Sequence, residues 1–210
     1  MNNTTSTIAR IVVIDDHGIV RYGYSQLINQ EPGLEFCGMA GTEKEGIEML
    51  NRLIPDVAIV DLSLKEGDGM DLIKEALSKY PHMKILVISA HDEKLFAHRV
   101  LAAGAFGFIN KQEAPQKLIE GIQAVFNGEF YFSKFVTKDL IRDRLGNRKP
   151  MRVEGIESLT NRELQVFEQI GNGQSTKQIS DQLYLSVKTI ERYKENIKRK
   201  LNITHVTQLV

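Results

Sequence analysis

Five polar residues of this 210-residue chain stand at the ends of short apolar runs. Asp15 and Asp16 follow RIVVI, Asp61 follows VAIV, Ser89 follows KILVI, and Lys111 comes two positions after FGFI. Together they supply three carboxylates, a hydroxyl and an ammonium group. Carboxylate oxygens suit Mg²⁺, which keeps several waters and so needs only one or two carboxylates directly. Because a carboxylate can also attack phosphorus and form an aspartyl phosphate, this set of groups indicates phosphoryl transfer.

Each group has a distinct task in such a reaction. Asp61 is the natural nucleophile, and the acidic pair near the start of the chain holds the metal, with the backbone carbonyl of Ser63 as a further ligand. The Ser89 hydroxyl would donate a hydrogen bond to the new phosphoryl group, and the Lys111 ammonium would pair with its charge. Phosphoryl transfer depends mostly on positioning and charge neutralisation. We therefore expect Mg²⁺ as the cofactor, with these ligands: Asp15, Asp16, Asp61 and Ser63.

The elements that must position these residues follow a regular pattern. The apolar runs are Arg10–Ile14, Leu34–Gly38, Val57–Val60, Lys84–Ile88 and Phe106–Ile109, and amphipathic stretches lie near 18–30, 43–53, 69–80, 93–103 and 114–127. Continuous apolar strands are typical of a parallel sheet that is covered on both faces. Five β-α units therefore predict an α/β, flavodoxin-like, doubly wound five-stranded parallel sheet. Ligands bind such a sheet outside the carboxyl ends of its strands, where the five polar residues stand.

The composition excludes several classes of protein. With 42% hydrophobic residues, the chain is not wholly disordered. The single cysteine, Cys37, excludes an internal disulfide and a cysteine-based zinc site. No apolar run approaches the ~20 residues of a membrane-spanning helix, and Met1–Thr7 is polar and uncharged, so we expect neither an anchor nor a secretory signal. A protein of the reducing cytoplasm is the simplest interpretation.

A net charge of zero hides a division along the chain. Residues 8–130 carry a net charge of −6, residues 131–155 carry +4, and residues 156–210 carry +2. Such asymmetry suggests a nucleic-acid partner for the basic part. Between about Ser133 and Gly155, basic residues, Gly146 and Pro150 replace the apolar periodicity. We therefore expect a partly helical linker at 131–155 between two domains, 8–130 and 156–210.

The rear domain shows only helical patterns, over 160–171, 175–182, 186–201 and from Thr204. Thr160 with Glu163 and Ser175 with Gln178 fit capping boxes, and a short turn precedes the third helix. Two helices joined by a tight turn suit a helix-turn-helix, whose second helix enters the major groove. That helix has a net charge of +4, from Lys188, Arg192, Lys194, Lys198, Arg199 and Lys200 against Glu191 and Glu195. Its predicted buried stripe is Val187, Ile190, Ile197 and Leu201.

Residues 8–130 resemble the receiver domain of two-component response regulators. The matching positions are the acidic pair Asp15 and Asp16, the phospho-acceptor Asp61, the switch hydroxyl Ser89, the lysine Lys111 and the switch aromatic Phe108. The stretch IDDHGIVRYG and the absence of proline after Lys111 resemble the NarL/FixJ subfamily. One departure is Lys65, where these proteins usually have proline; the change frees a backbone N–H and places a cation near the site.

Residues 156–203 resemble the LuxR-type DNA-binding domain of the same family. The matching residues are Leu159, Thr160, Arg162, Glu163, Gly173, Lys177, Ile179, Leu183, Ser186, Val187, Lys188, Thr189, Asn196, Ile197, Lys200 and Leu201. The resemblance implies a small all-α, four-helix domain that places the 188–200 helix in the major groove. We expect Lys177, Lys188 and Thr189 to contact phosphates and Arg192 to contact guanine. The remaining candidates for DNA contact are Lys194, Asn196 and Lys198. Glu191 and Glu195 occupy base-facing positions that family members often fill with basic or small residues, and their carboxylates could accept a hydrogen bond from cytosine.

The two domains in this order imply a response regulator whose DNA binding and effect on transcription are controlled by phosphorylation. A sensor histidine kinase would phosphorylate Asp61, and the modified receiver would shift Ser89 and Phe108 toward a second arrangement. Double-stranded DNA is the implied partner, and we expect a homodimer after phosphorylation, with half-sites one helical turn apart or a multiple of it. Family members use the helix expected from Thr204 for dimer contacts. Beyond possible autodephosphorylation, no dedicated enzyme activity is expected.

Three other classes of protein share some of these features. An aspartyl-phosphate hydrolase usually needs a second acid two positions after its nucleophile, where Ser63 stands. A flavin-binding α/β protein needs a neutral phosphate loop after its first strand, but Asp15 and Asp16 would repel a phosphate there. A regulator that acts through protein contacts, with a degenerate rear helix, stays open. A gel shift on genomic fragments, with and without a phosphodonor, would distinguish it.

Overall fold

The computed structural model describes residues 8–144 and 155–203. The chain divides into two compact units, residues 1–140 and residues 141–210. The first unit contains a β-sheet with helices around it, and the second is helical in its described part. Within the described ranges, no helix combines the length and apolar character needed to cross a lipid bilayer.

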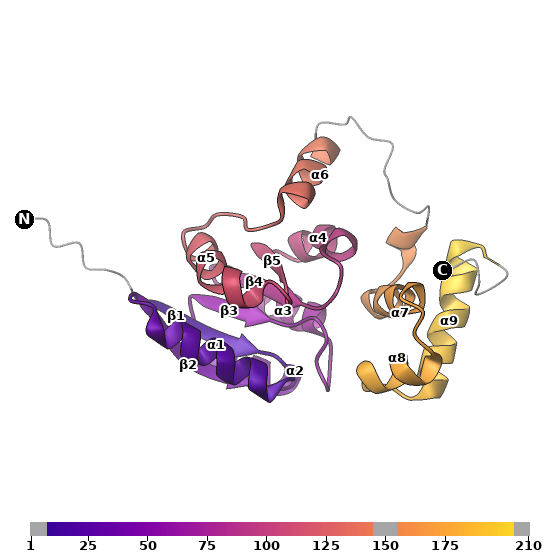
Figure 1. Cartoon of the computed structure of the whole chain (residues 1–210), viewed down its shortest axis with the longest axis horizontal. Coiled ribbons are helices and arrows are strands. Elements are labelled where there is room, and N and C mark those ends of the chain that lie inside the picture. Colours follow the sequence, from indigo (N-terminus) through magenta and orange to yellow (C-terminus); the bar gives the residue numbers. More distant parts are fainter. Residues whose placement is uncertain (1–7, 145–154, 204–210) are drawn as a thin grey trace, which may run out of the picture. The chain divides into compact units, whose positions relative to one another are not determined.

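Five strands form one parallel sheet in the order β2-β1-β3-β4-β5 (Figure 1). They are β1 (Ala9–Ile14), β2 (Leu34–Ala40), β3 (Val57–Val60), β4 (Lys84–Ser89) and β5 (Gly107–Asn110). All of β3 is buried, and so is β4 after its first residue, as expected for strands between two layers of helices. The predicted flavodoxin-like sheet is confirmed. Its strand order reverses beside β1 and β3, which makes the carboxyl ends of these strands the expected ligand site.

Helices connect the strands and cover both faces of the sheet (Figure 1). They are α1 (Gly18–Gln30), α2 (Glu43–Leu53), α3 (Gly69–Lys79), α4 (Glu93–Ala102) and α5 (Ala114–Phe126). Ile28 of α1 and Ile122 of α5 share one core with residues of the central strands. On the opposite face, Gly46 of α2 lies against Ile14 and Leu72, and an added Cβ there would stand 2.7 Å from a Leu72 methyl carbon. Glycine therefore lets α2 approach the sheet closely.

The chain after α5 is attached to the open edge of β5. The Tyr131 N–H donates to the carbonyl of Phe106 at 2.9 Å, and the Tyr131 carbonyl accepts a hydrogen bond from the N–H of Phe108 at 2.8 Å. The tyrosine side chain packs against the core that α1 and α5 form with the sheet. The backbone groups of an edge strand need partners, and this segment provides them beside the predicted switch aromatic.

Helix α6 (Lys134–Arg144) follows and contacts α4. The N–H of Ser133 donates to the Glu93 carboxylate at 2.8 Å, and Asp139 lies 3.5 Å from the His98 ring nitrogen. Part of the segment expected as a linker is therefore helical and held against the first unit. Residues 145–154 of that segment lie outside the described residues.

After α6, the described part of the second unit contains a short 3₁₀ turn (Ile156–Ser158) and helices α7 (Asn161–Gly171), α8 (Thr176–Gln182) and α9 (Val187–Leu201). The predicted capping boxes at Thr160 and Ser175 are both present. Ile190 and Ile197 are fully buried, as predicted, but Val187 is 48% exposed. Val187 is the first residue of α9, and the buried residues of this helix begin only at Ile190. The helix expected from Thr204 lies outside the described residues.

Candidate functional site

The strand ends bring the predicted carboxylates and lysine together. Asp15 follows β1, Asp61 follows β3, and Lys111 follows β5. The Lys111 Nζ lies 2.8 Å from Asp15 Oδ2 and 2.7 Å from Asp61 Oδ2. The lysine side chain is 17% exposed, whereas the two aspartate side chains are only 3% and 2% exposed. One ammonium group thus bridges two buried carboxylates at the edge of the sheet where ligands are expected.

Burial makes the Asp61 carboxylate costly to ionise. Burial raises the pKa of Asp61, the Lys111 ammonium lowers it, and the neighbouring Asp15 raises it again; the net result is a pKa above the usual value. Burial alone would lower the pKa of Lys111, but the carboxylates of Asp61 and Asp15 outweigh this effect and raise it. The lysine is therefore held in its charged form. A single ammonium between two carboxylates leaves excess negative charge, which a bound cation would relieve.

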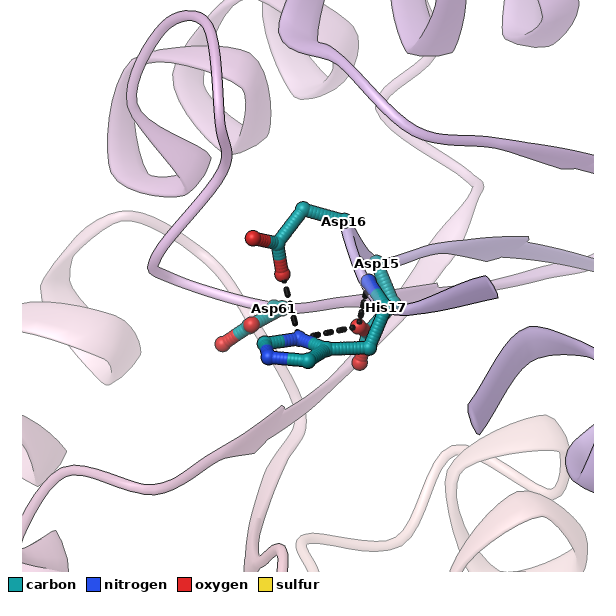
Figure 2. Close-up of side chains that lie close together, drawn as sticks. All are labelled: Asp15, Asp16, His17 and Asp61. Atoms are coloured by element: carbon teal, nitrogen blue, oxygen red, sulfur yellow. Dashed lines mark hydrogen bonds and ion pairs between the residues drawn. The ribbon is translucent and has the colours of Figure 1, made fainter. Parts of the chain in front are cut away.

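Asp16 and His17 extend this site into a group of four side chains able to bind a metal (Figure 2). One ligand atom each from Asp15, Asp16, His17 and Asp61 lies within 4.8 Å of the others. The His17 Nδ1 is 2.6 Å from Asp16 Oδ1 and 3.2 Å from Asp15 Oδ1. The three carboxylates therefore share one site, as the strand ends suggested. The sequence alone favours His17 as a polar residue that opens the first helix over a role as metal ligand, because spacing does not show that the ring turns back toward the carboxylates.

Ser63, predicted as a backbone ligand, is linked to Asp61 and to a buried histidine. Its N–H donates to Asp61 Oδ1 at 3.2 Å, and its hydroxyl lies 2.8 Å from Nε2 of His91. The His91 ring stacks on Phe96 with 4.7 Å between the ring centroids. His91 thereby ties the loop after β3 to the loop after β4. It was not predicted as part of the site, since this contact depends on how two loops fold over the sheet edge.

The two predicted switch residues are buried beside the site. Ser89 is fully buried at the end of β4, and its hydroxyl accepts a hydrogen bond from the N–H of His91 at 3.4 Å. The Ser89 carbonyl accepts the N–H of Lys111 at 2.9 Å, so the serine adjoins the lysine. Phe108 is 3% exposed in β5. Ser89 therefore lies in the interior of the receiver, hydrogen-bonded to both the loop of His91 and the backbone of Lys111.

The predicted DNA-binding residues lie on α8 and α9 of the second unit. Lys177, Lys188 and Arg192 are exposed, and Thr189 is half-buried. Ser186 caps α9 by accepting the N–H of Thr189 at 3.1 Å. The outward positions of the lysines and the arginine suit contacts to a nucleic acid.

The other candidates on α9 are engaged in contacts within the unit. Lys194 donates to the Glu191 carboxylate at 2.9 Å and to the Thr176 hydroxyl at 3.0 Å. Lys198 pairs with Glu195 one turn before it, and the Asn196 side-chain oxygen accepts a hydrogen bond from Arg199 at 3.1 Å. Lys194 and Lys198 are also only 17% and 22% exposed. Contacts from these lysines to DNA would therefore compete with their present partners.

Glu163 and Lys200 join α7 to α9. The Lys200 Nζ lies 2.6 Å from Glu163 Oε2, which also accepts the N–H of Thr160 at 2.8 Å. Burial raises the pKa of Glu163, but the hydrogen bonds from Lys200 and Thr160 outweigh it, so the net pKa is lowered. Lys200 therefore stabilises the unit and is not directed at a ligand.

Comparison with known proteins assigns both units. The model of the response regulator receiver domain matches residues 11–123, and that of the luxR family of bacterial regulatory proteins matches residues 157–210. The transcriptional regulatory protein DegU of Brevibacillus brevis is 31% identical, over 96% of this chain and 91% of its own length.

Solved structures agree with this assignment. One of them is RcsB from Salmonella enterica serovar Typhimurium, bound to promoter P1flhDC in the presence of the phosphomimetic BeF3−. It is 26% identical and has a TM-score of 0.65, over 97% of this chain and 96% of that chain. A structure of two RcsB dimers bound to two parallel DNAs has a TM-score of 0.59 at 26% identity, over 96% and 95% of the two chains. With its 2-1-3-4-5 sheet, its carboxylates at the strand ends and its capped helix-turn-helix, the chain belongs to the NarL/FixJ family of response regulators, in which a receiver domain precedes a LuxR-type DNA-binding domain.

Proposed function

We propose that this response regulator accepts a phosphoryl group on Asp61 from a sensor histidine kinase, and that the modification controls its sequence-specific binding to DNA. The observation that carries the proposal is the Asp61 carboxylate itself. It is 2% exposed, it lies 2.7 Å from the Lys111 ammonium, and it is grouped with the carboxylates of Asp15 and Asp16. Asp15 shares this burial and the contact with Lys111, but the resemblance to receiver domains assigns Asp15 to the metal and Asp61 to the phosphoryl group.

The chemistry follows from these neighbours. An oxygen of Asp61 forms a bond to phosphorus as the bond from phosphorus to the kinase imidazole breaks, and the imidazole nitrogen keeps the electron pair. Lys111 then pairs with the added negative charge, and the Ser89 hydroxyl donates to a phosphoryl oxygen once its loop has moved. The buried Ser89 and Phe108 thereby favour a second arrangement of the receiver, a shift of population.

Mg²⁺ is the cofactor that we propose for this site. The donor set fits the ion, because three carboxylates converge with excess negative charge and Mg²⁺ prefers oxygen ligands. Asp15, Asp16, Asp61 and the backbone carbonyl of Ser63 would hold it. When bound, Mg²⁺ neutralises charge on the transferring phosphoryl group.

On the DNA side, we propose that α9 enters the major groove as the recognition helix. Lys177, Lys188 and Thr189 would contact phosphates, and Arg192 would contact guanine. Lys194, Asn196 and Lys198 stay candidates, with the lysines exchanging their present carboxylate partners for DNA.

RcsB, 26% identical, binds DNA as a dimer in a solved structure, and we propose the same assembly for this chain when it is phosphorylated.

The proposed organisation assigns residues 8–130 to the receiver, 131–155 to the linker and 156–210 to the DNA-binding domain. The protein would act in the cytoplasm, where both its DNA and the kinase domain of its partner are found. Its part in phosphoryl transfer is that of an acceptor and not that of a dedicated enzyme.

Labelling by a small phosphodonor tests the assigned acceptor. The full chain is incubated with acetyl phosphate and Mg²⁺, and the added phosphoryl group is located by mass spectrometry of its peptides. We expect label on the peptide that contains Asp61 and none in the Asp61→Asn variant. Asp56→Asn, outside the site, is the matched control and should label normally. Equal labelling of Asp61→Asn would refute the assignment.

A further inference from the structure

One carboxylate on the DNA-facing side of α9 is held in place by a neighbouring helix. Glu191 Oε1 accepts a hydrogen bond from the Thr176 hydroxyl of α8 at 2.8 Å and from the Lys194 ammonium at 2.9 Å. The same ammonium donates to Thr176 at 3.0 Å, which closes a three-membered network. Two donors thus fix one oxygen of Glu191 and set the direction of the other.

The second oxygen, Oε2, accepts no hydrogen bond from any residue that the structure describes. The Glu191 side chain is 49% exposed, although its partner Lys194 is only 17% exposed. The hydrogen bond from Lys194, followed by that from Thr176, lowers the pKa of Glu191 and keeps its carboxylate ionised. An ionised carboxylate only accepts hydrogen bonds, so the exposed oxygen needs a donor from outside the chain.

Glu191 lies on the exposed face of α9 that would turn toward base edges in a bound duplex. Lys188, Glu191, Arg192 and Glu195 are all exposed and follow the spacing of one helix face, while Ile190 and Ile197 on the other side are buried. In helix-turn-helix proteins, the N-terminal part of the second helix contacts the bases. Glu191 is the fifth residue of α9 and so lies in that part.

We propose that Glu191 is a specificity-determining residue, whose free oxygen accepts a hydrogen bond from the exocyclic amino group of cytosine in the major groove. The inference rests on the proposed binding of α9 to DNA and adds the base that this position selects. Lys194 and Thr176 act as positioning residues, so Lys194 keeps Glu191 as its partner and does not exchange it for a direct contact with DNA.

The chemistry of the base edges favours cytosine over the alternatives. Guanine and thymine present acceptor oxygens, which repel a carboxylate. Adenine presents an amino group but places the acceptor N7 beside it, whereas cytosine presents the amino donor alone. The guanine paired with that cytosine offers two acceptors, which suit the neighbouring Arg192. A C·G pair is therefore the expected feature of the operator beneath the start of α9.

Selection from random duplexes tests the proposal. The full chain, treated with acetyl phosphate and Mg²⁺, is used to enrich bound sequences, in parallel with Glu191→Ala and Asp181→Ala. We expect the wild-type chain to prefer cytosine at one position by about tenfold, the scale of a single mismatched pair. Glu191→Ala should lose the preference at that position only. Asp181→Ala removes the same charge from an exposed position of α8, outside the recognition helix, and should keep the preference.

Three further variants test whether the anchoring of Glu191 by Thr176 and Lys194 sets the base preference. In Glu191→Gln, the amide carbonyl oxygen can keep the hydrogen bonds to Thr176 and Lys194, which leaves the amide NH₂ group facing the base. Because this group donates, the base preference of the variant should move from cytosine to a base that presents an acceptor. Thr176→Val should weaken the preference for cytosine, and Thr176→Ser, which keeps the hydroxyl, should restore it. A second probe carries 2-pyrimidinone, which lacks the amino group, in place of the selected cytosine. The wild-type chain should bind this probe about tenfold more weakly than the cytosine probe. Glu191→Ala should bind the two probes equally well.

The outcomes separate this inference from the proposed function. If the wild-type chain enriches no sequence, binding of DNA by α9 is itself wrong. If it enriches a sequence and Glu191→Ala enriches the same bases at every position, the role of Glu191 is wrong while DNA binding stands. A selected adenine in place of cytosine would also overturn the choice of base.

Discussion

Replacing Lys111 by methionine should destabilise the receiver more than any other exchange of a single lysine there. The Nζ atom lies 2.8 Å from Asp15 and 2.7 Å from Asp61, whose side chains are nearly inaccessible to solvent. Removing one partner of a buried ion pair costs about 3–5 kcal/mol, because the remaining charges stay buried and unpaired. At roughly 3 °C per kcal/mol for a unit of this size, the melting temperature should fall by about 10–15 °C.

Thermal unfolding followed by circular dichroism, at neutral pH and without divalent cations, measures this loss. Lys117→Met is the matched control, since Lys117 is 41% exposed and forms a surface ion pair with Glu113 one turn away; its cost should stay below ~0.5 kcal/mol. Adding Asp61→Asn to Lys111→Met should recover much of the loss, because it removes one of the two carboxylates left unpaired. A loss no larger than that of Lys117→Met would show that the ammonium does not hold the site together.

Three further predictions concern the metal, the second unit and the DNA. Adding Mg²⁺ should raise the melting temperature of the wild-type receiver, and Asp16→Asn should reduce that rise; an unchanged rise would exclude Asp16 as a ligand. Glu163→Gln should lower the free energy of unfolding of the second unit by about 1.5–3 kcal/mol at neutral pH. Because the pKa of Glu163 is lowered in the folded unit, its stabilisation is fully present above the usual carboxyl pKa and is lost as the pH falls from there through the lowered pKa. NMR signals of α9 during denaturation would report this loss, and a difference between the variant and the wild type that does not change with pH would contradict the ion pair. Lys188→Ala should weaken binding to all duplexes and reduce by about one the slope of log affinity against log salt concentration, whereas Arg192→Ala should relax the base preference. Binding that does not depend on salt would contradict the phosphate contacts.

Much of the receiver could be predicted from local patterns. The strand of Val57–Val60 and the helix ends near Leu53 and Gln30 follow from runs of apolar residues and their interruption. Since parallel strands share one carboxyl edge, the convergence of Asp15 and Asp61 follows from the order of elements alone. Local sequence determines these features, so no knowledge of distant contacts is needed.

Contacts between loops and between helices could not be predicted in this way. The hydrogen bond between Ser63 and His91 joins residues 28 positions apart, and that from the Lys194 ammonium to the Thr176 hydroxyl joins residues 18 positions apart. Each depends on the rotamers of two side chains and on the path of the backbone between them. The exposure of Val187 shows the same limit, because helical spacing does not reveal where along a helix its packing begins.

The most direct test of the central claim measures DNA affinity with and without phosphorylation. Fluorescence anisotropy of a labelled duplex from the selection is recorded for the full chain and for Asp61→Asn, each with and without acetyl phosphate and Mg²⁺. We predict that the phosphodonor changes the affinity of the wild-type chain and leaves that of Asp61→Asn unaltered. An affinity that the phosphodonor does not change in the wild type, or changes equally in the variant, would contradict control of DNA binding through Asp61.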